Sequence, residues 1–153
     1  MKSLRFFASL ALLAAPALAQ QCAATVTEPV KLRVARKGVT EQRLKVSLPA
    51  GCHANSNTPI EAFLIPLKLT WTAGAVEAAA TDYPKASMEK YEFSEKPISV
   101  VSGQFEIVTK FKRSATAQPG PGSLTGKLRY QACNDKMCFP PKTVELRLPL
   151  LLE

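Results

Sequence analysis

The sequence is poor in the residues and segments on which several classes of protein depend. It has a single histidine, His53, among 153 residues, and it has no glycine-rich phosphate-binding loop. No recognisable nucleophile motif surrounds this histidine, so Ser–His–Asp catalysis has no support. After the first twenty residues, no stretch reaches the roughly 20 apolar residues needed to span a bilayer.

The positive charge of the chain is spread thinly. The formal net charge is +8, and no run of five or more basic residues occurs. Nor do aromatic residues alternate with basic ones in a nucleic-acid-binding motif. The charge pattern therefore argues against a nucleic-acid partner.

The first residues, "MKSLRFFASLALLAAPALAQQ", have the anatomy of a secretory signal. A short basic region precedes an apolar run, and small residues precede a cleavage site expected after Ala19. An uncleaved membrane anchor is the alternative, but the apolar run is too short. Cys22 lies near the site, yet two glutamines before it fit a lipid-attachment signal poorly. We expect residues 1–19 to be a signal peptide and residues 20–153 to be one exported domain, periplasmic or secreted.

Export changes the meaning of the four cysteines, because oxidising compartments favour disulfides. Two bridges allow three connectivities. Pairing Cys22 with Cys52 would close the longer loop and stabilise the fold by about 3.7 kcal/mol in the chain-entropy model. A bridge between Cys133 and Cys138 would contribute only about 2 kcal/mol. The second bridge can therefore open without unfolding the domain.

The domain has the pattern of an all-β protein. Apolar residues alternate with polar ones over several runs, as in strands with one buried face. We expect strands within residues 25–35, 43–48, 63–71, 97–101, 104–112, 124–132 and 143–151. Many short strands between turn signals favour an immunoglobulin-like two-sheet β-sandwich.

Three segments fall outside this alternation. Residues 74–83 are expected to form at most one short helical turn, bounded by Gly74 and Pro84. Residues 113–124 are rich in Pro, Gly and Ser and predict an exposed loop. Residues 80–97 predict a long loop that is either functional or a cover for the open end of the sandwich.

The stretch "YQACNDKMCFPP" (130–141) holds two cysteines separated by four residues. Its turn-compatible centre predicts two antiparallel strand ends with Cys133 facing Cys138. In a non-hydrogen-bonded antiparallel pair the Cα atoms lie about 4.5 Å apart, within the range of about 4.4–6.8 Å that a disulfide tolerates. The spacing differs from the Cys-x-x-Cys of thioredoxin, and Pro140 and Pro141 forbid a continuing helix. The spacing alone leaves both a hairpin staple and a redox-active pair open.

Two blocks resemble the amino-terminal periplasmic domain of DsbD, the thiol:disulfide interchange protein. "YQACNDKMCFPPKT" (130–143) is similar to its active-site hairpin, and "GCHANSNTPIEAFLIPLKLTW" (51–71) to an earlier segment. The resemblance covers roughly residues 25–150. Cys22 and Cys52 are not part of the motif, and some relatives have a longer loop between the redox cysteines.

The resemblance implies a function for the hairpin. Cys133 and Cys138 would form a redox pair that takes electrons from a thioredoxin-like donor and reduces exported partner proteins. The resemblance does not give the order of attack, and we favour Cys138 as the sulfur attacked first. It also implies a cap loop within residues 90–97, with Tyr91 and Phe93 as shields. No cofactor is implied.

Two other classes of function remain open from the sequence. Cys133, Met137, Cys138 and His53 offer soft ligands to Cu(I) or Zn, although their spacing matches no known metal pattern. A β-sandwich binding module with two inert disulfides is the third class. It predicts bridges with potentials below about −300 mV.

Overall fold

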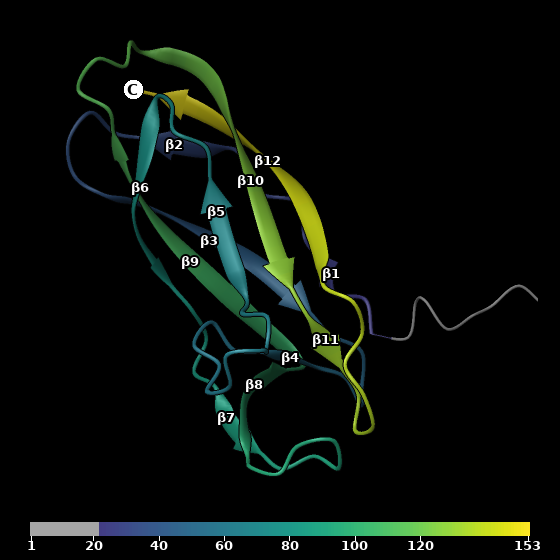
Figure 1. Ribbon diagram of the computed structural model, residues 1–153. Coiled ribbons are helices and arrows are strands. Elements are labelled where there is room, and N and C mark those ends of the chain that lie inside the picture. The colour runs from purple at the N-terminus through teal and green to yellow at the C-terminus, as the bar shows by residue number, and fades with distance from the viewer. Residues whose placement is uncertain (1–21) are drawn as a thin grey trace, which may run out of the picture.

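Residues 22–153, which the computed structural model describes, form twelve strands in three sheets and no helix (Figure 1). The first sheet has the order β1 (Thr25–Val26), β3 (Thr40–Ser47), β9 (Gln104–Arg113) and β6 (Val76–Asp82). The second has β2 (Leu32–Val34), β12 (Lys142–Leu152), β10 (Gly120–Tyr130) and β5 (Lys68–Trp71). The third has β11 (Ala132–Cys133), β4 (His53–Asn55), β8 (Ile98–Ser102) and β7 (Ser87–Glu89). The predicted signal peptide, residues 1–19, lies outside the described residues.

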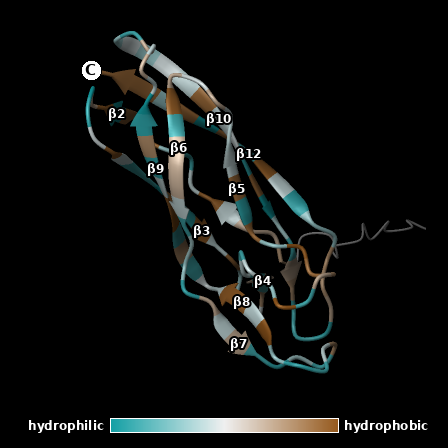
Figure 2. Cartoon of the chain, turned by 60° about the vertical axis from the view of Figure 1, so that its left-hand side comes forward, coloured by the Kyte–Doolittle hydropathy of each residue, from teal (hydrophilic) through white to brown (hydrophobic). Residues whose placement is uncertain are grey.

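The first two sheets pack face to face and enclose the core. Bands of hydrophobic and hydrophilic colour alternate along their strands in Figure 2, as the period of a half-buried strand requires. The core combines side chains of both sheets, among them Leu44, Val46, Ile107, Leu128 and Leu146. The prediction of an all-β, immunoglobulin-like fold is confirmed, and a third sheet extends one end of the sandwich. No helix within residues 22–153 is long and apolar enough to cross a membrane.

Trp71 ties the two main sheets together. Its indole Nε1 donates to Thr109 Oγ1 at 3.0 Å, and its ring meets Phe111 edge-on at 5.6 Å between centroids. Its strand partner is Gly126, where an added Cβ would lie 2.5 Å from the Trp71 ring. Only glycine therefore lets the ring lie across β10.

The expected segments differ from the observed elements in several places. Residues 74–83 contain β6, so the prediction of a helical turn is wrong. β6 is an edge strand that pairs with β9 through a bulge between Ala78 and Ala80, and most of its side chains are exposed. Because most of β6 is exposed at the edge of the sheet, its alanine-rich sequence shows no alternation of apolar and polar residues.

The other differences concern strand limits. β10 begins at Gly120, inside the segment expected to be a loop, and β7 lies inside the expected long loop. The strand expected over residues 63–71 is confined to β5, and the one expected over residues 25–35 is divided into β1 and β2.

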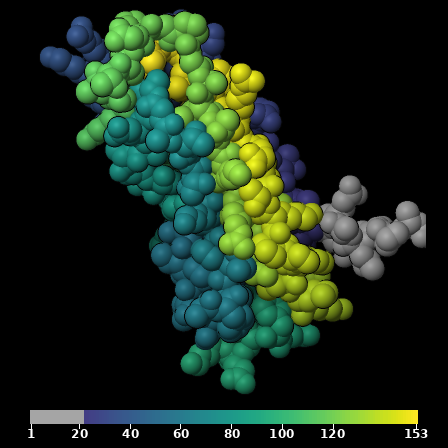
Figure 3. Space-filling view, turned by 45° about the horizontal axis from the view of Figure 1, so that its top comes forward, coloured from purple at the N-terminus to yellow at the C-terminus, as the bar shows by residue number. Residues whose placement is uncertain are grey.

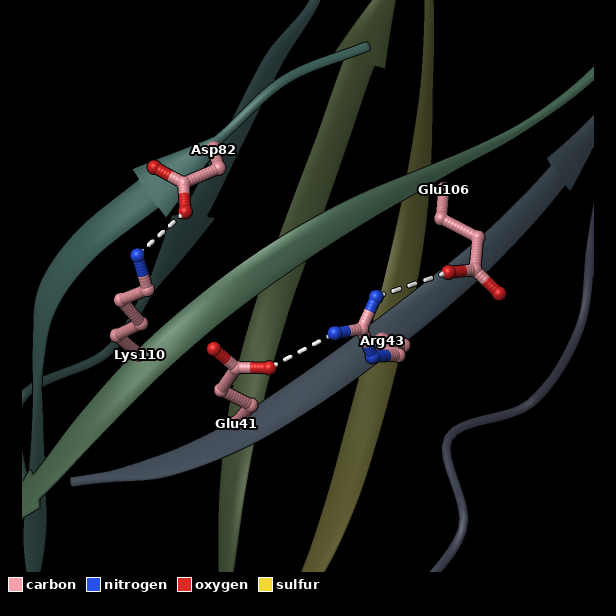
Figure 4. A network of polar contacts seen from close by, with 5 residues as sticks. All are labelled: Glu41, Arg43, Asp82, Glu106 and Lys110. Carbon is pink, nitrogen blue, oxygen red and sulfur yellow. Dashed lines mark hydrogen bonds and ion pairs between the residues drawn. The ribbon is translucent and has the colours of Figure 1, made fainter.

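The outer face of the first sheet carries exposed ion pairs (Figure 4). Arg43 bonds Glu41 at 2.9 Å and Glu106 at 3.3 Å, and Lys110 bonds Asp82 at 2.7 Å. These carboxylates raise the pKa of Arg43 and of Lys110. Exposed pairs of this kind contribute little stability, but they keep this face polar.

In the third sheet, β4, β11 and β8 as far as Val101 are buried on both faces, whereas the edge strand β7 is exposed. Ala54, Val101 and Ala132 face the main core, while Ile98 and Val100 pack with Leu64 on the opposite face. β8 leaves this sheet through Gly103, whose φ of 64° makes the turn into β9. Figure 1 shows the small sheet at the end of the molecule away from the C-terminus.

Candidate functional site

Cys133 and Cys138 form a disulfide at the end of the hairpin that leads from β11 toward β12. Their Cα atoms lie 3.9 Å apart, and the two residues form an antiparallel bridge. The flanking hydrogen bonds run from Asn134 N to Met137 O (2.9 Å) and from Phe139 N to Ala132 O (2.8 Å). This is the non-hydrogen-bonded type of pair that the four-residue loop predicts.

The loop between the cysteines is held by Asn134. Its Oδ1 accepts hydrogen bonds from the backbone N–H groups of Lys136 (2.9 Å) and Met137 (2.8 Å). A side chain that mimics a backbone turn in this way is typical of asparagine. The loop is thus ordered by its own sequence and presents Met137, 54% exposed, beside Cys138.

The two cysteines of the bridge differ in their exposure to solvent. Cys133 is fully buried at 0% exposure, whereas Cys138 is partly exposed. Of the two cysteines, Cys138 is therefore the more accessible to an incoming thiolate. Because accessibility influences which sulfur of a disulfide is attacked, the two sulfurs of this bridge are not equivalent toward an incoming thiolate.

Side-chain hydrogen bonds of Gln131 connect the hairpin to the rest of the domain. Its Oε1 accepts from Asn55 Nδ2 (3.0 Å) and from Ile65 N (3.2 Å), and its Nε2 donates to the carbonyl of Phe139 (3.2 Å). Asn55 is fully buried and also donates to the carbonyl of Ile65 at 3.0 Å. The network joins both strands of the hairpin to β4 and to the segment before β5.

A second disulfide lies against the first. Cys22 and Cys52 are joined with Cα atoms 5.5 Å apart, and Cys22 Sγ lies 3.7 Å from the Cys133 carbonyl oxygen. The contact is not a hydrogen bond, because a disulfide sulfur carries no proton. Tyr130 holds the same region, since its hydroxyl accepts a hydrogen bond from Ala24 N at 2.9 Å.

His53 stands directly opposite Cys133 in the β4–β11 pair. It is 3% exposed, and its Nε2 has no hydrogen-bond partner among the described residues. Burial lowers the pKa of His53 to about 4, with a smaller opposing effect from Glu89. The ring is therefore neutral at pH 7.

Tyr91 and Phe93 cover this histidine. The Tyr91 ring stacks on His53 at 4.0 Å between centroids, and Phe93 stacks on Tyr91 at 5.5 Å. Burial, with the charge of Glu89, raises the pKa of Tyr91. In Figures 1 and 2 the segment after β7 lies beside the cysteine hairpin, and Figure 3 shows the two in contact at the lower end of the molecule.

The segment that carries these rings is folded on itself. Ser94 N donates to the Tyr91 carbonyl at 3.2 Å, Ser94 Oγ donates to the Lys96 carbonyl at 2.7 Å, and the Lys90 ammonium donates to the Ser94 carbonyl. Phe93, together with Glu61 and the exposed Phe63, lines a shallow hollow beside it. The end of the molecule near the bridge is thus rich in exposed apolar side chains.

The soft-metal hypothesis concerns the same residues. Among residues 22–153 no group of three or more His, Cys, Asp or Glu side chains is arranged to hold a metal ion. The Cys133 and Cys138 sulfurs are bonded to one another, so neither is a thiolate ligand in this state.

Two residues of the site, Asn55 and Gln131, were not identified from the sequence. Gln131 lies inside the cysteine motif, and Asn55 lies two residues after His53, on the same side of β4. The only sequence signal for their role is that each lies within one of the two blocks that resemble the family. Their role depends on a contact between segments 76 residues apart.

The sequence profile described as thiol:disulfide interchange protein DsbD, N-terminal, matches residues 20–149. No curated protein sequence matches the chain. The crystal structure of the N-terminal periplasmic domain of ScsB from Proteus mirabilis is similar, with a TM-score of 0.58 at 15% identity. The match covers 89% of this chain and 49% of that one, so the chain spans about half the length of that structure.

The N-terminal domain of DsbD from Neisseria meningitidis, solved in the reduced form, is 18% identical with a TM-score of 0.47. The match covers 76% of this chain and 80% of the Neisseria domain. At such identities the structural likeness to ScsB shows the fold alone, whereas the profile match extends over most of the sequence. The chain therefore belongs to the family of the DsbD N-terminal domain, a family of thiol–disulfide interchange.

Proposed function

We propose that this chain is an exported thiol–disulfide exchange domain that acts through Cys133 and Cys138. It receives electrons from a thioredoxin-like donor and passes them to disulfides of partner proteins. The observation that carries the proposal is the unequal exposure of the two cysteines, buried Cys133 and accessible Cys138, in the hairpin motif of its family. The domain then works as a protein-disulfide reductase.

The exchange has two halves, each of which balances. A donor thiolate attacks Cys138 Sγ, the Cys133–Cys138 bond breaks, and its electron pair leaves with Cys133 Sγ. The second donor thiol attacks the donor sulfur of the mixed disulfide and releases Cys138 as a thiolate. The donor ends as a disulfide, and the reduced pair takes up the proton of the second donor thiol, with any further proton coming from solvent.

The reduced pair then repeats this chemistry on a partner. The Cys138 thiolate attacks one sulfur of the partner disulfide and expels the other as a thiolate. Cys133 next attacks Cys138, which restores the bridge and releases the second partner thiol. Sulfur alone carries the electrons, so no cofactor is needed.

Tyr91 and Phe93 act as a cap in this proposal. They lie over His53, the strand neighbour of Cys133, in a segment beside the cysteine hairpin. A cap of this kind keeps unrelated thiols away from the pair and moves aside when a partner docks. Exposed Phe63 and Met137 provide apolar surface for that docking partner.

The two disulfides have different roles. Cys22–Cys52 closes a loop of larger sequence separation, 30 residues against 5, and serves as the structural bridge. Two disulfides suit an oxidising compartment, which supports export to the periplasm or beyond.

Double variants test the proposal directly. The oxidised protein is mixed with a reduced thioredoxin, and the thiols formed are mapped by alkylation and mass spectrometry. We expect C22S/C52S to retain exchange and C133S/C138S to lose it while staying folded. Exchange that persists in folded C133S/C138S would contradict the proposal.

A further inference from the structure

Four residues form a row across the third sheet. Ser102 of β8 pairs with His53 of β4, His53 pairs with Cys133 of β11, and Cys133 pairs with Cys138. Residues directly opposite in antiparallel strands point to the same face, with Cβ atoms about 4.5–5.5 Å apart. The His53 ring and both cysteine sulfurs therefore share one face of this sheet.

The imidazole on this face has an unused nitrogen. His53 is 3% exposed, yet its Nε2 has no hydrogen-bond partner among residues 22–153. Buried polar atoms are almost always paired, so an unpaired one requires an explanation, and a catalytic role is one such explanation. With the ring proton on Nδ1, the Nε2 lone pair is a free proton acceptor.

The chemistry of Cys133 requires such an acceptor. Once the bridge is open, Cys133 carries a thiol that lies inside the protein at 0% exposure. Burial raises the pKa of a thiol, and only the thiolate is a nucleophile. The step in which Cys133 attacks Cys138 thus needs a proton acceptor that solvent does not supply at this depth.

We propose that His53 is the proton acceptor for Cys133 in the resolving step of disulfide exchange. His53 Nε2 takes the proton of the Cys133 thiol, the resulting thiolate attacks Cys138 Sγ, and the bond from Cys138 to the partner sulfur breaks. The partner leaves as a thiolate, and the imidazolium returns its proton to solvent or to that thiolate. The inference rests on the proposed function and adds to it the group that moves the proton.

The surroundings of His53 suit this role. Tyr91 and Phe93 shield the ring, and burial keeps it neutral, with the lone pair available. Among the described titratable groups, Glu89 of β7 and the Tyr91 phenol are the ones that lie near the His53 ring. Glu89 favours the imidazolium that forms during transfer.

A two-phase reaction with 5,5′-dithiobis(2-nitrobenzoate) separates the steps. In protein reduced only at Cys133–Cys138, the first thionitrobenzoate is released when Cys138 attacks, and the second when Cys133 displaces the mixed disulfide. C133A identifies the first phase, because it releases one equivalent only. H53F keeps an aromatic ring for the Tyr91 stack and removes both nitrogens, and H53Q serves as a second variant.

We expect H53F and H53Q to slow the second phase about 100-fold at pH 7, in line with general acid–base catalysis, and to leave the first phase nearly unchanged. In the variants the second-phase rate should rise about tenfold per pH unit, whereas in the wild type it should be nearly flat from about pH 6 to 8, because neutral imidazole is the base. Q42L is the matched control, since Gln42 is another buried side chain with an unpaired atom, on β3 of the first sheet.

An unchanged second phase in both His53 variants would overturn the inference, and so would equal slowing of both phases. Exchange of the wild type with reduced thioredoxin, measured in parallel, tests the proposed function separately. If the wild type exchanges with thioredoxin but the second phase is unchanged in the variants, only the role of His53 is rejected. A wild type inert toward thioredoxin would remove the proposed function and the role of His53 within it.

Discussion

Gln131 Nε2 donates a hydrogen bond to the carbonyl oxygen of Phe139 at 3.2 Å, across the strand pair that carries the Cys133–Cys138 bridge. The same side chain accepts from Asn55 and from Ile65 N. One glutamine thus joins both sides of the cysteine hairpin to the body of the domain. In the proposed exchange, this anchoring would hold the hairpin backbone in place while the bridge opens and closes.

Removal of this side chain should destabilise the protein. Q131L leaves the Ile65 N–H and the Phe139 carbonyl without their partner and removes one acceptor from buried Asn55, so we expect a loss of about 2 kcal/mol in the free energy of unfolding. Urea denaturation measures it. Q104L, at an exposed position of β9, is the control and should change stability by less than about 0.5 kcal/mol. Equal effects of the two substitutions would contradict the anchoring role.

The two disulfides should differ in their contribution to stability. From their loop lengths, C22S/C52S should cost about 3.7 kcal/mol and C133S/C138S about 2 kcal/mol in the chain-entropy model. Guanidinium denaturation of the two double variants measures both losses. A larger loss from C133S/C138S would indicate that the hairpin bridge is the main staple of the fold.

Stability should depend on pH through His53. Its pKa falls from 6.5 in the unfolded chain to about 4 in the folded protein. Between these values the unfolded state binds a proton that the folded state does not, so stability is full above pH 6.5 and decreases as the pH falls toward 4. At pH 5 the loss is about 2 kcal/mol relative to pH 7.5.

Thermal or urea denaturation of wild type and H53F at pH 5 and pH 7.5 isolates this contribution. The difference between the two pH values should be smaller in H53F by about 2 kcal/mol, because its ring does not titrate. The same pH dependence in both proteins would show that His53 is not the group responsible.

The aromatic stack should control access to the bridge. Y91A and F93A remove the rings that lie over His53, and we expect dithiothreitol to open Cys133–Cys138 several-fold faster in both variants. V30A is the control, because Val30 is 78% exposed and lies beside β2 and β3, away from the stack. Opening rates equal to those of wild type and V30A would exclude a cap function for Tyr91 and Phe93.

The sequence predicts the parts of this molecule whose signal is local. The long strands of the sandwich carry period-two alternation over many residues, as at Leu44 and Val46 of β3. The hairpin follows from two cysteines around a turn-forming asparagine. Both can be inferred without knowledge of distant contacts.

In the third sheet the sequence predicts β8, as a strand within residues 97–101, but it predicts neither β4 nor β7. All three residues of β4 are buried, and β8 is buried on both faces from Ile98 to Val101, so neither strand alternates. The same limit applies to Asn55 and Gln131, whose importance depends on a contact made only in the folded chain. His53 was visible as the single histidine, but its position opposite Cys133 follows from strand register alone.

The reduction potential of each disulfide tests the central claim most directly. The purified protein is equilibrated in glutathione buffers of defined ratio, and the state of each cysteine is read by alkylation and mass mapping. We predict that Cys133–Cys138 equilibrates with glutathione while Cys22–Cys52 stays closed, as a structural bridge below about −300 mV does. If both bridges resist reduction, the hairpin is a staple and the domain is not a thiol–disulfide exchanger.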